Sequence, residues 1–398
     1  MRLTQTLLLT AAAILLATPA LATDVKIGVL NDRSGIYADL SGEGSVIAAR
    51  MAVEDFDAAT KGINVEIVSA DHQNKADIAS NIARQWYDQE GVDMIVDVPT
   101  SSAAFAVSDI TREKGKVFIN SGAGSADLTG TKCSPNTIHW TYDTWALAKG
   151  TGGAMVAAGN TKWFFITADY AFGHSLEKDT SDVVTAAGGE VVGTVRHPFP
   201  GTDFSSFLLQ AQSSGAQVIG LANAGGDTVN TIKQAAEFGI TQGGQALAGL
   251  LIFITDVHAL GLQTAQGLVL TESFYWDLND ETRAWSERFA AQNGGKMPTM
   301  VHAGVYAGVL HYLKSVEATG GKDSTALMAS MKSMPTDDPL FGAGMVREDG
   351  RKIHDMYLFK VKAPDQSSGP WDYYEKIATI PAAEAFRPMA DGGCELVD

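Results

Sequence analysis

The chain has 398 residues, a formal net charge of −17 and 19% charged residues. A surface this acidic argues against nucleic acid and anionic membranes as partners. A chain of this length usually has more than one hydrophobic core, so we expect two domains. The sequence contains no low-complexity tract and no block of like charge, so we expect no disordered tail.

The N-terminus has the pattern of a secretory signal peptide. Residues 1–22 contain one basic residue, Arg2, an apolar run from Leu7 to Leu16, and small residues at Ala20 and Ala22. Cleavage is expected after Ala22. The apolar run is too short to span a bilayer, so we expect the mature protein to be exported and soluble.

The first part of the chain alternates apolar runs of strand length with amphipathic helices. The predicted strands are 24–30, 64–70, 94–98 and 116–119. The predicted helices between them bury stripes through Val46, Ala49, Val53 and Phe56, through Ala79, Ile82, Ala83 and Trp86, and through Ala103, Val107 and Ile110. This β-α-β order predicts a right-handed parallel sheet.

The same alternation restarts after Asp143. The predicted strands are 163–167, 190–195, 217–221, 246–253 and 267–271. We therefore expect an α/β fold with two doubly wound parallel sheets in tandem. The last third adds helices and one strand, 356–361, which are too few for a third core and should pack on the two sheets. Repeated crossing between the lobes predicts a hinge with a cleft beneath it.

The two cysteines, Cys133 and Cys394, both lie in the mature part of the chain. An even count in an oxidising compartment favours one disulfide, which would pin the C-terminal tail to the first half. Two unpaired thiols are the alternative. No CxxC or Cys/His ligand spacing is present, so we expect no metal site.

Small hydroxyl-bearing residues and glycines follow two consecutive predicted strands. Ser101 and Ser102 begin a helix after Pro99, and 121–125 reads SGAGS, with Gly122, Ala123 and Gly124 at its centre. Ligands of open α/β sheets bind at the carboxyl ends of strands, where free N–H groups attract anions. We interpret this edge as half of an anion-binding cleft. The alternative is that Ser101 only caps its helix and the glycines only turn the chain.

Aromatic residues are concentrated in loops that follow strands. Such positions enclose a small ligand in a mostly apolar pocket. The alternative is that these rings only pack loops against the sheets. The residues are Tyr37, Tyr142, Tyr170, Phe172, Tyr275 and Trp276.

The sequence gives little support for catalysis. It has no GxSxG, HExxH, GxxxxGK[ST] or complete GxGxxG motif in its Gly-rich loops. The eight histidines are scattered, and His302 and His311 are nine residues apart, which does not place them as a ligand pair. Acidic residues near strand ends have no nucleophile and base beside them. We expect neither an enzyme nor a cofactor.

Several stretches together resemble one family. They are VKIGVLNDRSGIYADLSGEG, PTSSAA, SGAGSADLTG, TADYAFG and AGVYAGVLHYLKSVEATGG. They look like the periplasmic solute-binding proteins of the branched-chain amino acid (Leu/Ile/Val) ABC importer family. The resemblance implies a type I periplasmic binding protein fold with a three-crossover hinge, a periplasmic location and delivery of ligand to an inner-membrane ABC permease. It places lobe 1 at 23–142 and 273–345, lobe 2 at 143–272 and 346–380, and a tail at 381–398.

The resemblance also implies which residues bind the ligand. The family's serine for the ligand carboxylate matches Ser101, and its backbone contacts match Gly122 and Ala123. A threonine that helps hold the α-amino group is replaced by Gly124, and the tyrosine of the second lobe by Phe172. The glutamate that pairs with the ligand ammonium falls on a leucine of AGLLIF, either Leu250 or Leu251. A buried ammonium without a carboxylate partner costs several kcal/mol.

We therefore hypothesise a ligand that has a carboxylate but no α-ammonium. TADYAFG and ANAGGDTVN look similar to the family branch that takes up aromatic acids such as benzoate or phenylpropanoid derivatives, with Asn223 bonding a ring hydroxyl or the carboxylate. If Asp169, Asp227 or Glu272 replaced the missing acid, an amino acid would remain the ligand.

Two other classes of function stay open at this stage. A ligand sensor for a receptor would have the same two-lobed fold. A secreted hydrolase would need a nucleophile, base and acid converging in the cleft, for which the sequence offers no set. A transport shuttle must present both lobes to its permease, so the resemblance implies a monomer.

Overall fold

The N-terminal half folds into a five-stranded parallel sheet. The computed structural model describes residues 23–397, so the predicted signal peptide lies outside the described residues. The strand order is β2-β1-β3-β4-β5. The strands are β1 (Thr23–Asn31), β2 (Ile63–Asp71), β3 (Met94–Asp97), β4 (Val117–Asn120) and β5 (Thr137–His139). The last of these was not predicted, and the other four lie where the apolar runs placed them.

Both faces of this sheet are covered by helices. In β3, Met94 and Val96 belong to the buried cluster that includes α1 (Gly42–Phe56) and α12 (Met300–Thr319). Ile95, which points to the other face, belongs to the cluster of α2 (Ala76–Gln85) and α3 (Ser101–Lys114). A strand buried on both faces reads as a continuous apolar run, as β3 does. The C-terminal helices α12 and α13 (Ser324–Ser333) pack on this first lobe, as expected.

The second lobe contains two sheets. A four-stranded parallel sheet has the order β7-β6-β8-β9, and a three-stranded antiparallel sheet has the order β10-β13-β14. Phe359 and Tyr374 of the second sheet share a buried cluster with Ile166 and Leu221 of the first. The strands are β6 (Lys162–Ala168), β7 (Glu190–His197), β8 (Val218–Ala222), β9 (Ala246–Gly249), β10 (Val269–Glu272), β13 (Met356–Val361) and β14 (Tyr374–Ile380).

Two predictions for this lobe were wrong in detail. The strand expected over 246–253 ends at Gly249, and 250–253 is a loop that leads into α9 (Ile254–Leu260). The Asp256 carboxylate accepts a hydrogen bond from the Phe253 N–H at 2.9 Å and so fixes the start of that helix. Residues 250–253 are apolar although they form a loop, because all four are buried. The strand near 267–271 pairs antiparallel with β13 and does not extend the parallel sheet.

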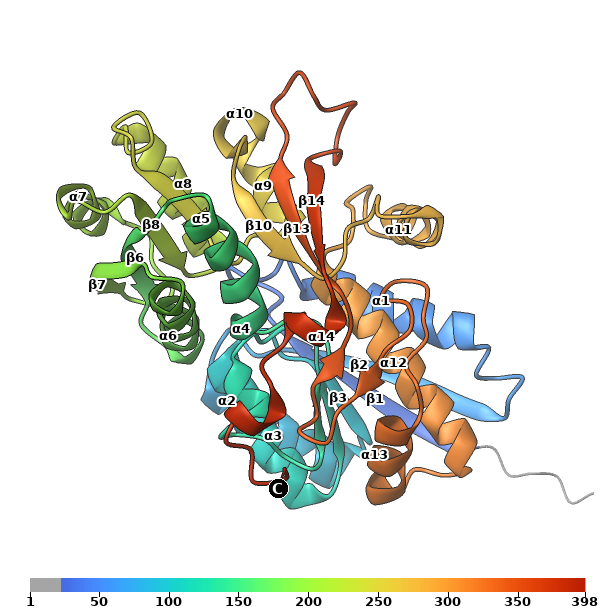
Figure 1. Cartoon of the computed structure of the whole chain (residues 1–398). Coiled ribbons are helices and arrows are strands. Elements are labelled where there is room, and N and C mark those ends of the chain that lie inside the picture. The colour runs from blue at the N-terminus through green and yellow to red at the C-terminus, as the bar shows by residue number, and fades with distance from the viewer. Residues whose placement is uncertain (1–22, 398) are drawn as a thin grey trace, which may run out of the picture.

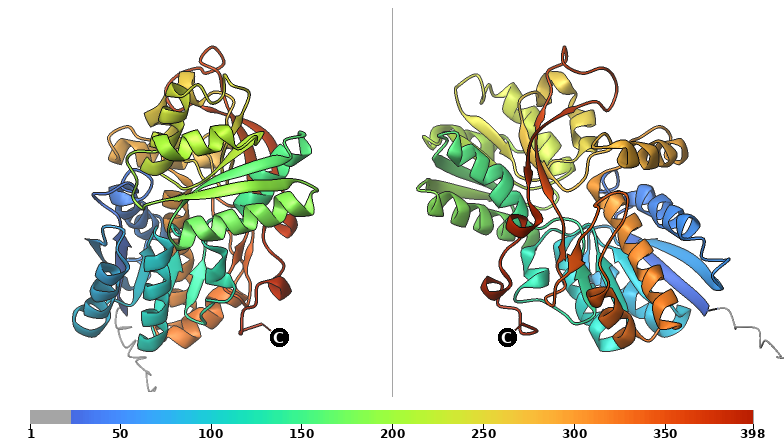
Figure 2. Two further views of the ribbon diagram at one scale, coloured as in Figure 1. Left: turned by 90° about the vertical axis from the view of Figure 1, so that its left-hand side faces the viewer. Right: turned by 45° about the vertical axis from the view of Figure 1, so that its right-hand side comes forward.

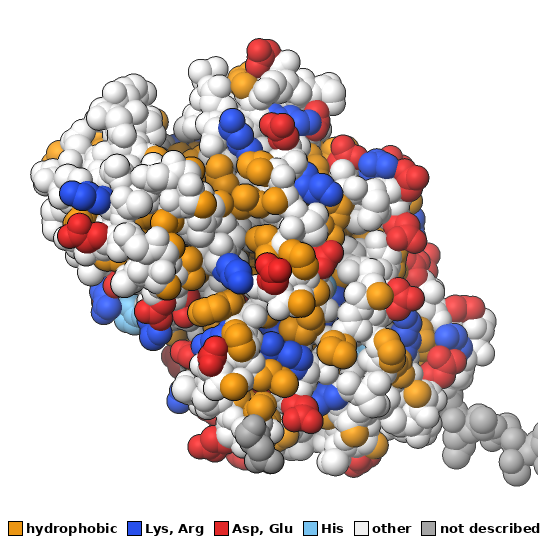
Figure 3. Space-filling view, viewed as in Figure 1, with side chains coloured by type: hydrophobic (Ala, Val, Ile, Leu, Met, Phe, Trp, Pro, Cys, Tyr) orange, Lys and Arg blue, Asp and Glu red, His pale blue; other side chains and the backbone are white. Residues whose placement is uncertain are grey.

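The remaining elements cover the lobes and connect them (Figures 1 and 2). No helix within residues 23–397 is both long and apolar enough to cross a membrane. On the face in Figure 3, acidic and basic side chains are interspersed, and hydrophobic side chains gather over the middle of the molecule. The elements are η1 (Trp86–Glu90), η2 (Ala126–Thr129), α4 (Thr144–Leu147), η3 (Ala148–Gly152), α5 (Gly153–Ala157), α6 (Ala171–Ala186), α7 (Ser205–Ser213), α8 (Gly226–Glu237), α10 (Leu262–Ala265), α11 (Asp280–Gln292), β11 (Met345–Val346), β12 (Lys352–Ile353), α14 (Ala382–Ala385) and η4 (Met389–Asp391).

The chain passes between the lobes three times, after β5, after β10 and after β12. The third crossing was expected at 345/346, whereas Arg351 still pairs with His139 of the first lobe. After β14 the tail returns to the first lobe, where the predicted Cys133–Cys394 disulfide is confirmed. The C-terminus therefore lies beside the first lobe (Figure 1). The tail thus adds a fourth connection between the lobes, as expected from the pairing of Cys394 with Cys133.

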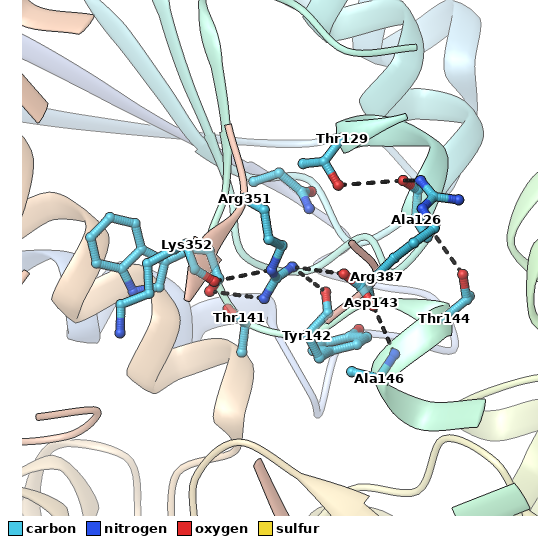
Figure 4. Close-up of polar contacts among 12 residues, drawn as sticks. Ala126, Thr129, Thr141, Tyr142, Asp143, Thr144, Ala146, Arg351, Lys352 and Arg387 are labelled. Atoms are coloured by element: carbon cyan, nitrogen blue, oxygen red, sulfur yellow. Dashed lines mark hydrogen bonds and ion pairs between the residues drawn. The ribbon is translucent and has the colours of Figure 1, made fainter. Parts of the chain in front are cut away.

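A buried arginine ties three of these four connections together (Figure 4). The Arg351 side chain is fully buried, and its guanidinium donates to the carbonyls of Tyr142 at 3.1 Å and Trp140 at 3.3 Å in the first crossing. It lies 3.5 Å from the Asp143 carboxylate and stacks over the Phe386 ring of the tail at 4.1 Å. Burial lowers the pKa of Arg351 to about 10, which leaves it charged at neutral pH.

We expect Arg351→Met to destabilise the protein strongly. The change leaves the buried Asp143 carboxylate and two carbonyls without their donor, and breaking a buried ion pair from one side costs about 3–5 kcal/mol. Urea denaturation measures the loss. Arg50→Ala is the matched control, because Arg50 is 62% exposed and reaches Glu43 only at 4.0 Å; its effect should stay within about 0.5 kcal/mol. Equal stability of the two variants would contradict the role given to Arg351.

The disulfide should stabilise the fold through the tail. It closes a loop with a sequence separation of 261 residues, and removing a native disulfide typically costs about 2–5 kcal/mol. We expect Cys133→Ser/Cys394→Ser to unfold at a lower temperature than the parent protein. Dithiothreitol should lower the Tm of the parent and leave that of the double variant unchanged. A Tm of the parent that does not respond to reduction would show that the tail contributes nothing to stability.

Candidate functional site

A cavity lies between the lobes, at the carboxyl ends of strands from both parallel sheets. Its volume, measured over the positions that the centre of a water-sized sphere can take, is about 10 Å³, which is room for about one water molecule. This is smaller than the pockets that hold drug-sized ligands. The lining residues are Tyr37, Leu40, Pro99, Gly122, Gly124 and Tyr142 from the first lobe and its crossing, and Tyr170, Phe172, Ala224, Leu251 and Phe253 from the second lobe.

The wall from the first lobe is built by the turn after β4 and the start of α3. The Asn120 side chain holds the turn, because it donates to the Ala123 carbonyl at 2.7 Å and accepts from the Ala123 N–H at 3.1 Å. Ser101 Oγ accepts from the Ser125 N–H at 3.2 Å, and the Ser101 hydroxyl proton has no acceptor among residues 23–397. No side chain caps α3, since the Thr100 hydroxyl donates to Asn74 instead. The positive end of this helix is therefore uncompensated next to Pro99, which lines the cavity.

Gly124 is required by the rings that pack against it. A Cβ at this position would lie 2.8 Å from the Phe172 ring and 2.9 Å from the Tyr142 ring. A threonine side chain would therefore not fit without moving both rings. The two rings take up the space beside Gly124, and the Tyr142 hydroxyl donates to the Gly122 carbonyl.

Direct contacts between the lobes close the cavity. The Tyr37 and Tyr170 hydroxyls lie 2.6 Å apart, and the Gly226 N–H donates to the Ile36 carbonyl at 3.2 Å. Ser125 Oγ donates to Ser175 Oγ at 3.1 Å. The structure is thus a closed form, in which both lobes touch across the site.

The three acidic residues considered as partners for a ligand ammonium do not line the cavity. Asp227 accepts from the Gly201 N–H at 2.9 Å, and burial raises its pKa to about 7. Glu272 accepts from the Tyr374 hydroxyl at 2.9 Å, and burial raises its pKa well above the usual value. Asp169 is exposed and pairs with His174 at 2.8 Å. Within residues 23–397, the cavity lining contains no charged side chain.

The structure brings six of the predicted site residues together around the cavity. They are Tyr37, Gly122, Gly124, Tyr142, Tyr170 and Phe172. Ser101, Ser102 and Ala123 belong to the adjoining helix start and turn but do not line the cavity. Their contacts with a ligand stay predictions.

Asn223 and Tyr275 lie outside the lining, and both are already hydrogen-bonded. The Asn223 amide donates to His197 and Thr231 at 3.2 Å each, and its oxygen accepts from Thr228 at 2.7 Å. The Tyr275 hydroxyl donates to the Trp371 carbonyl at 3.2 Å, and Trp276 Nε1 donates to the same carbonyl at 2.8 Å. These contacts favour the alternative reading of Tyr275 and Trp276 as packing residues.

Four lining residues were not predicted: Leu40, Pro99, Ala224 and Phe253. Leu251 was considered only as a possible position of the missing glutamate. Leu251 and Phe253 were not expected to line the cavity, because the apolar run 246–253 was predicted as one strand. The loop after the strand was therefore not recognised. Among residues 23–397, no group of three or more His, Cys, Asp or Glu is placed to hold a metal.

Comparison with known proteins identifies the family. The model of the periplasmic binding protein family matches residues 24–369. A Leu/Ile/Val-binding protein homolog from Brucella melitensis is 28% identical over 97% of this chain and 98% of its own length. A periplasmic binding protein from Burkholderia mallei is 53% identical, with a TM-score of 0.92 over 94% of this chain and 100% of its own.

Two further solved structures share the fold. A branched-chain amino acid ABC transporter periplasmic ligand-binding protein from Burkholderia xenovorans is 41% identical, with a TM-score of 0.83 over 94% of this chain and 99% of its own. An ABC transporter solute-binding protein from Rhodopseudomonas palustris, in complex with benzoate, is 24% identical, with a TM-score of 0.80 over 90% of this chain and 97% of its own. The chain belongs to the periplasmic binding protein family and is a substrate-binding protein of the branched-chain amino acid ABC transporter type.

Proposed function

We propose that this chain captures an aromatic carboxylate between its lobes and delivers it to an inner-membrane ABC permease for import. Membership of the family supports the transport role and the periplasmic setting. The ligand class rests on the cavity, whose closed, mostly aromatic lining contains no charged side chain among residues 23–397.

The lining disfavours an amino acid ligand. An α-ammonium buried in this cavity would lie among aromatic rings, Leu251 and Phe253, without a carboxylate to pair with it. Burying an unpaired charge costs several kcal/mol. Gly124 also removes the hydroxyl with which the family holds that group, and Phe172 and Tyr142 fill the space.

The same wall favours a carboxylate. The uncapped start of α3 offers free N–H groups and a positive helix end, and the Ser101 hydroxyl keeps a proton to donate. The remaining lining is aromatic and apolar, which matches the chemistry of a flat ring, and the lobes must open to admit it. The Rhodopseudomonas palustris protein of the same fold was solved with benzoate, a carboxylate on a flat ring.

A panel of ligands tests the proposed class. We expect benzoate and 4-hydroxybenzoate to raise the Tm of the mature protein and leucine and valine to leave it unchanged. Ligand at a hundredfold its Kd stabilises by about 2.7 kcal/mol, which moves the Tm by several degrees. Differential scanning fluorimetry gives the shift. If leucine or valine raised the Tm and the aromatic acids did not, the proposed ligand would be wrong and the family assignment would stand.

Ser101→Ala tests the anion site. The change removes a hydrogen bond to a charged group, worth about 1.5–3 kcal/mol, so affinity for the aromatic carboxylate should fall by roughly 10- to 150-fold. Isothermal titration calorimetry gives the Kd. Ser206→Ala, at an exposed position on α7, is the control and should bind like the parent. Unchanged affinity in Ser101→Ala would remove this serine from the site.

A further inference from the structure

Two tyrosine hydroxyls meet across the closed cavity. Tyr37 follows β1 in the first lobe and Tyr170 follows β6 in the second, and their oxygens lie 2.6 Å apart. Both residues line the cavity. Burial raises the pKa of each above its ordinary value, so both hydroxyls keep their protons at neutral pH.

The pair leaves one proton unused. Each phenol has one proton to donate, and a bond between two phenols uses only one of the two. Neither hydroxyl has another hydrogen-bond partner among residues 23–397. One O–H therefore lacks an acceptor, and a buried donor without an acceptor is unfavourable.

The rings that carry these hydroxyls are held in place by packing. Tyr170 stacks on Phe199 with ring centroids 4.0 Å apart and an interplanar angle of 19°. The Tyr37 N–H donates to the Asp32 carboxylate at 2.9 Å. Gly225 lets the Tyr37 ring approach closely, since a Cβ there would lie 2.8 Å from it. In the closed form, the free O–H is thus held in a fixed position at the cavity.

We propose that the Tyr37–Tyr170 pair is a specificity determinant that donates its free proton to a second oxygen of the ligand, carried on the ring. This inference rests on the proposed function and narrows it to a hydroxylated aromatic acid. In this arrangement the ligand carboxylate accepts from the Ser101 hydroxyl and the N-terminus of α3, both of which follow β3. The ring oxygen accepts a hydrogen bond from the tyrosine pair, whose members follow β1 and β6. A site built to hydrogen-bond a hydroxyl discriminates strongly against the analogue that lacks it.

The test compares benzoate with 3-hydroxybenzoate and 4-hydroxybenzoate by isothermal titration calorimetry. The mature parent protein should bind one hydroxylated acid at least about tenfold more tightly than benzoate. In Tyr37→Phe/Tyr170→Phe, benzoate and the preferred hydroxylated acid should bind with nearly equal Kd. Loss of the bond between the lobes weakens closure on both ligands alike, so the ratio of the two Kd values isolates the contact with the ring oxygen.

Three further measurements complete the design. Tyr312→Phe is the matched control, since Tyr312 is a buried tyrosine of α12 outside the cavity lining, and it should keep the parent ratio. The single variants Tyr37→Phe and Tyr170→Phe identify which hydroxyl faces the ligand and serve if the double variant does not fold. Thermal unfolding of each variant checks that it is folded.

The outcomes separate the two proposals. Equal affinity of the parent for benzoate and both hydroxylated acids overturns the inference and leaves the proposed function standing. If the double variant keeps the parent's preference for a hydroxylated acid over benzoate, the inference is also overturned, because another group must then bind the ring oxygen. Failure of all three acids to bind overturns the proposed ligand class and the inference together.

Discussion

The geometry of the site depends on a buried cation outside it. The Arg351 guanidinium donates to the carbonyls of Trp140 and Tyr142 and lies beside Asp143 (Figure 4). It also packs on the Phe386 ring. It therefore joins the first crossing, the third crossing and the returning tail. Tyr142 belongs both to this cluster and to the cavity lining. Arg351 therefore helps to position the cavity wall, although it does not line the cavity itself. Asp143 extends the cluster into the second lobe, because its carboxylate caps α4 through the Ala146 N–H at 2.8 Å.

The cavity combines a polar wall from the first lobe with a mostly aromatic and apolar lining. The turn after β4 and the uncapped start of α3 still offer donors to an anion. The rings of Phe172 and Tyr142 pack so closely that Gly124 has no room for a side chain. The lining offers apolar walls from both lobes and, among residues 23–397, no charged side chain, and the proposed ligand class rests on this. Closure brings those walls together through the contact between Tyr37 and Tyr170.

Most of the fold was predictable because it follows from local patterns. Apolar runs bounded by Gly-rich loops located β1 to β4 and β6 to β8, and the even cysteine count gave the disulfide. Short strands such as β5, and β14 with five exposed residues, lack an apolar run and were missed. The loop 250–253 was taken for strand because burial in a cavity wall and burial in a sheet produce the same apolar sequence.

The site was predictable only in part, for a related reason. Residues after strand ends could be named, and six of them line the cavity. Which of the other aromatic residues would turn inward depends on tertiary packing: Tyr275 bonds to Trp371 and Asn223 to His197, and neither contact has a signal in the local sequence.

Competitive equilibrium dialysis tests the central claim most directly. The mature protein is dialysed against an equimolar mixture of benzoate, 4-hydroxybenzoate, leucine and valine, and the retained ligand is identified by mass spectrometry after denaturation. The account predicts that an aromatic acid is retained and that neither amino acid is enriched. Retention of leucine or valine in preference to the aromatic acids would contradict it.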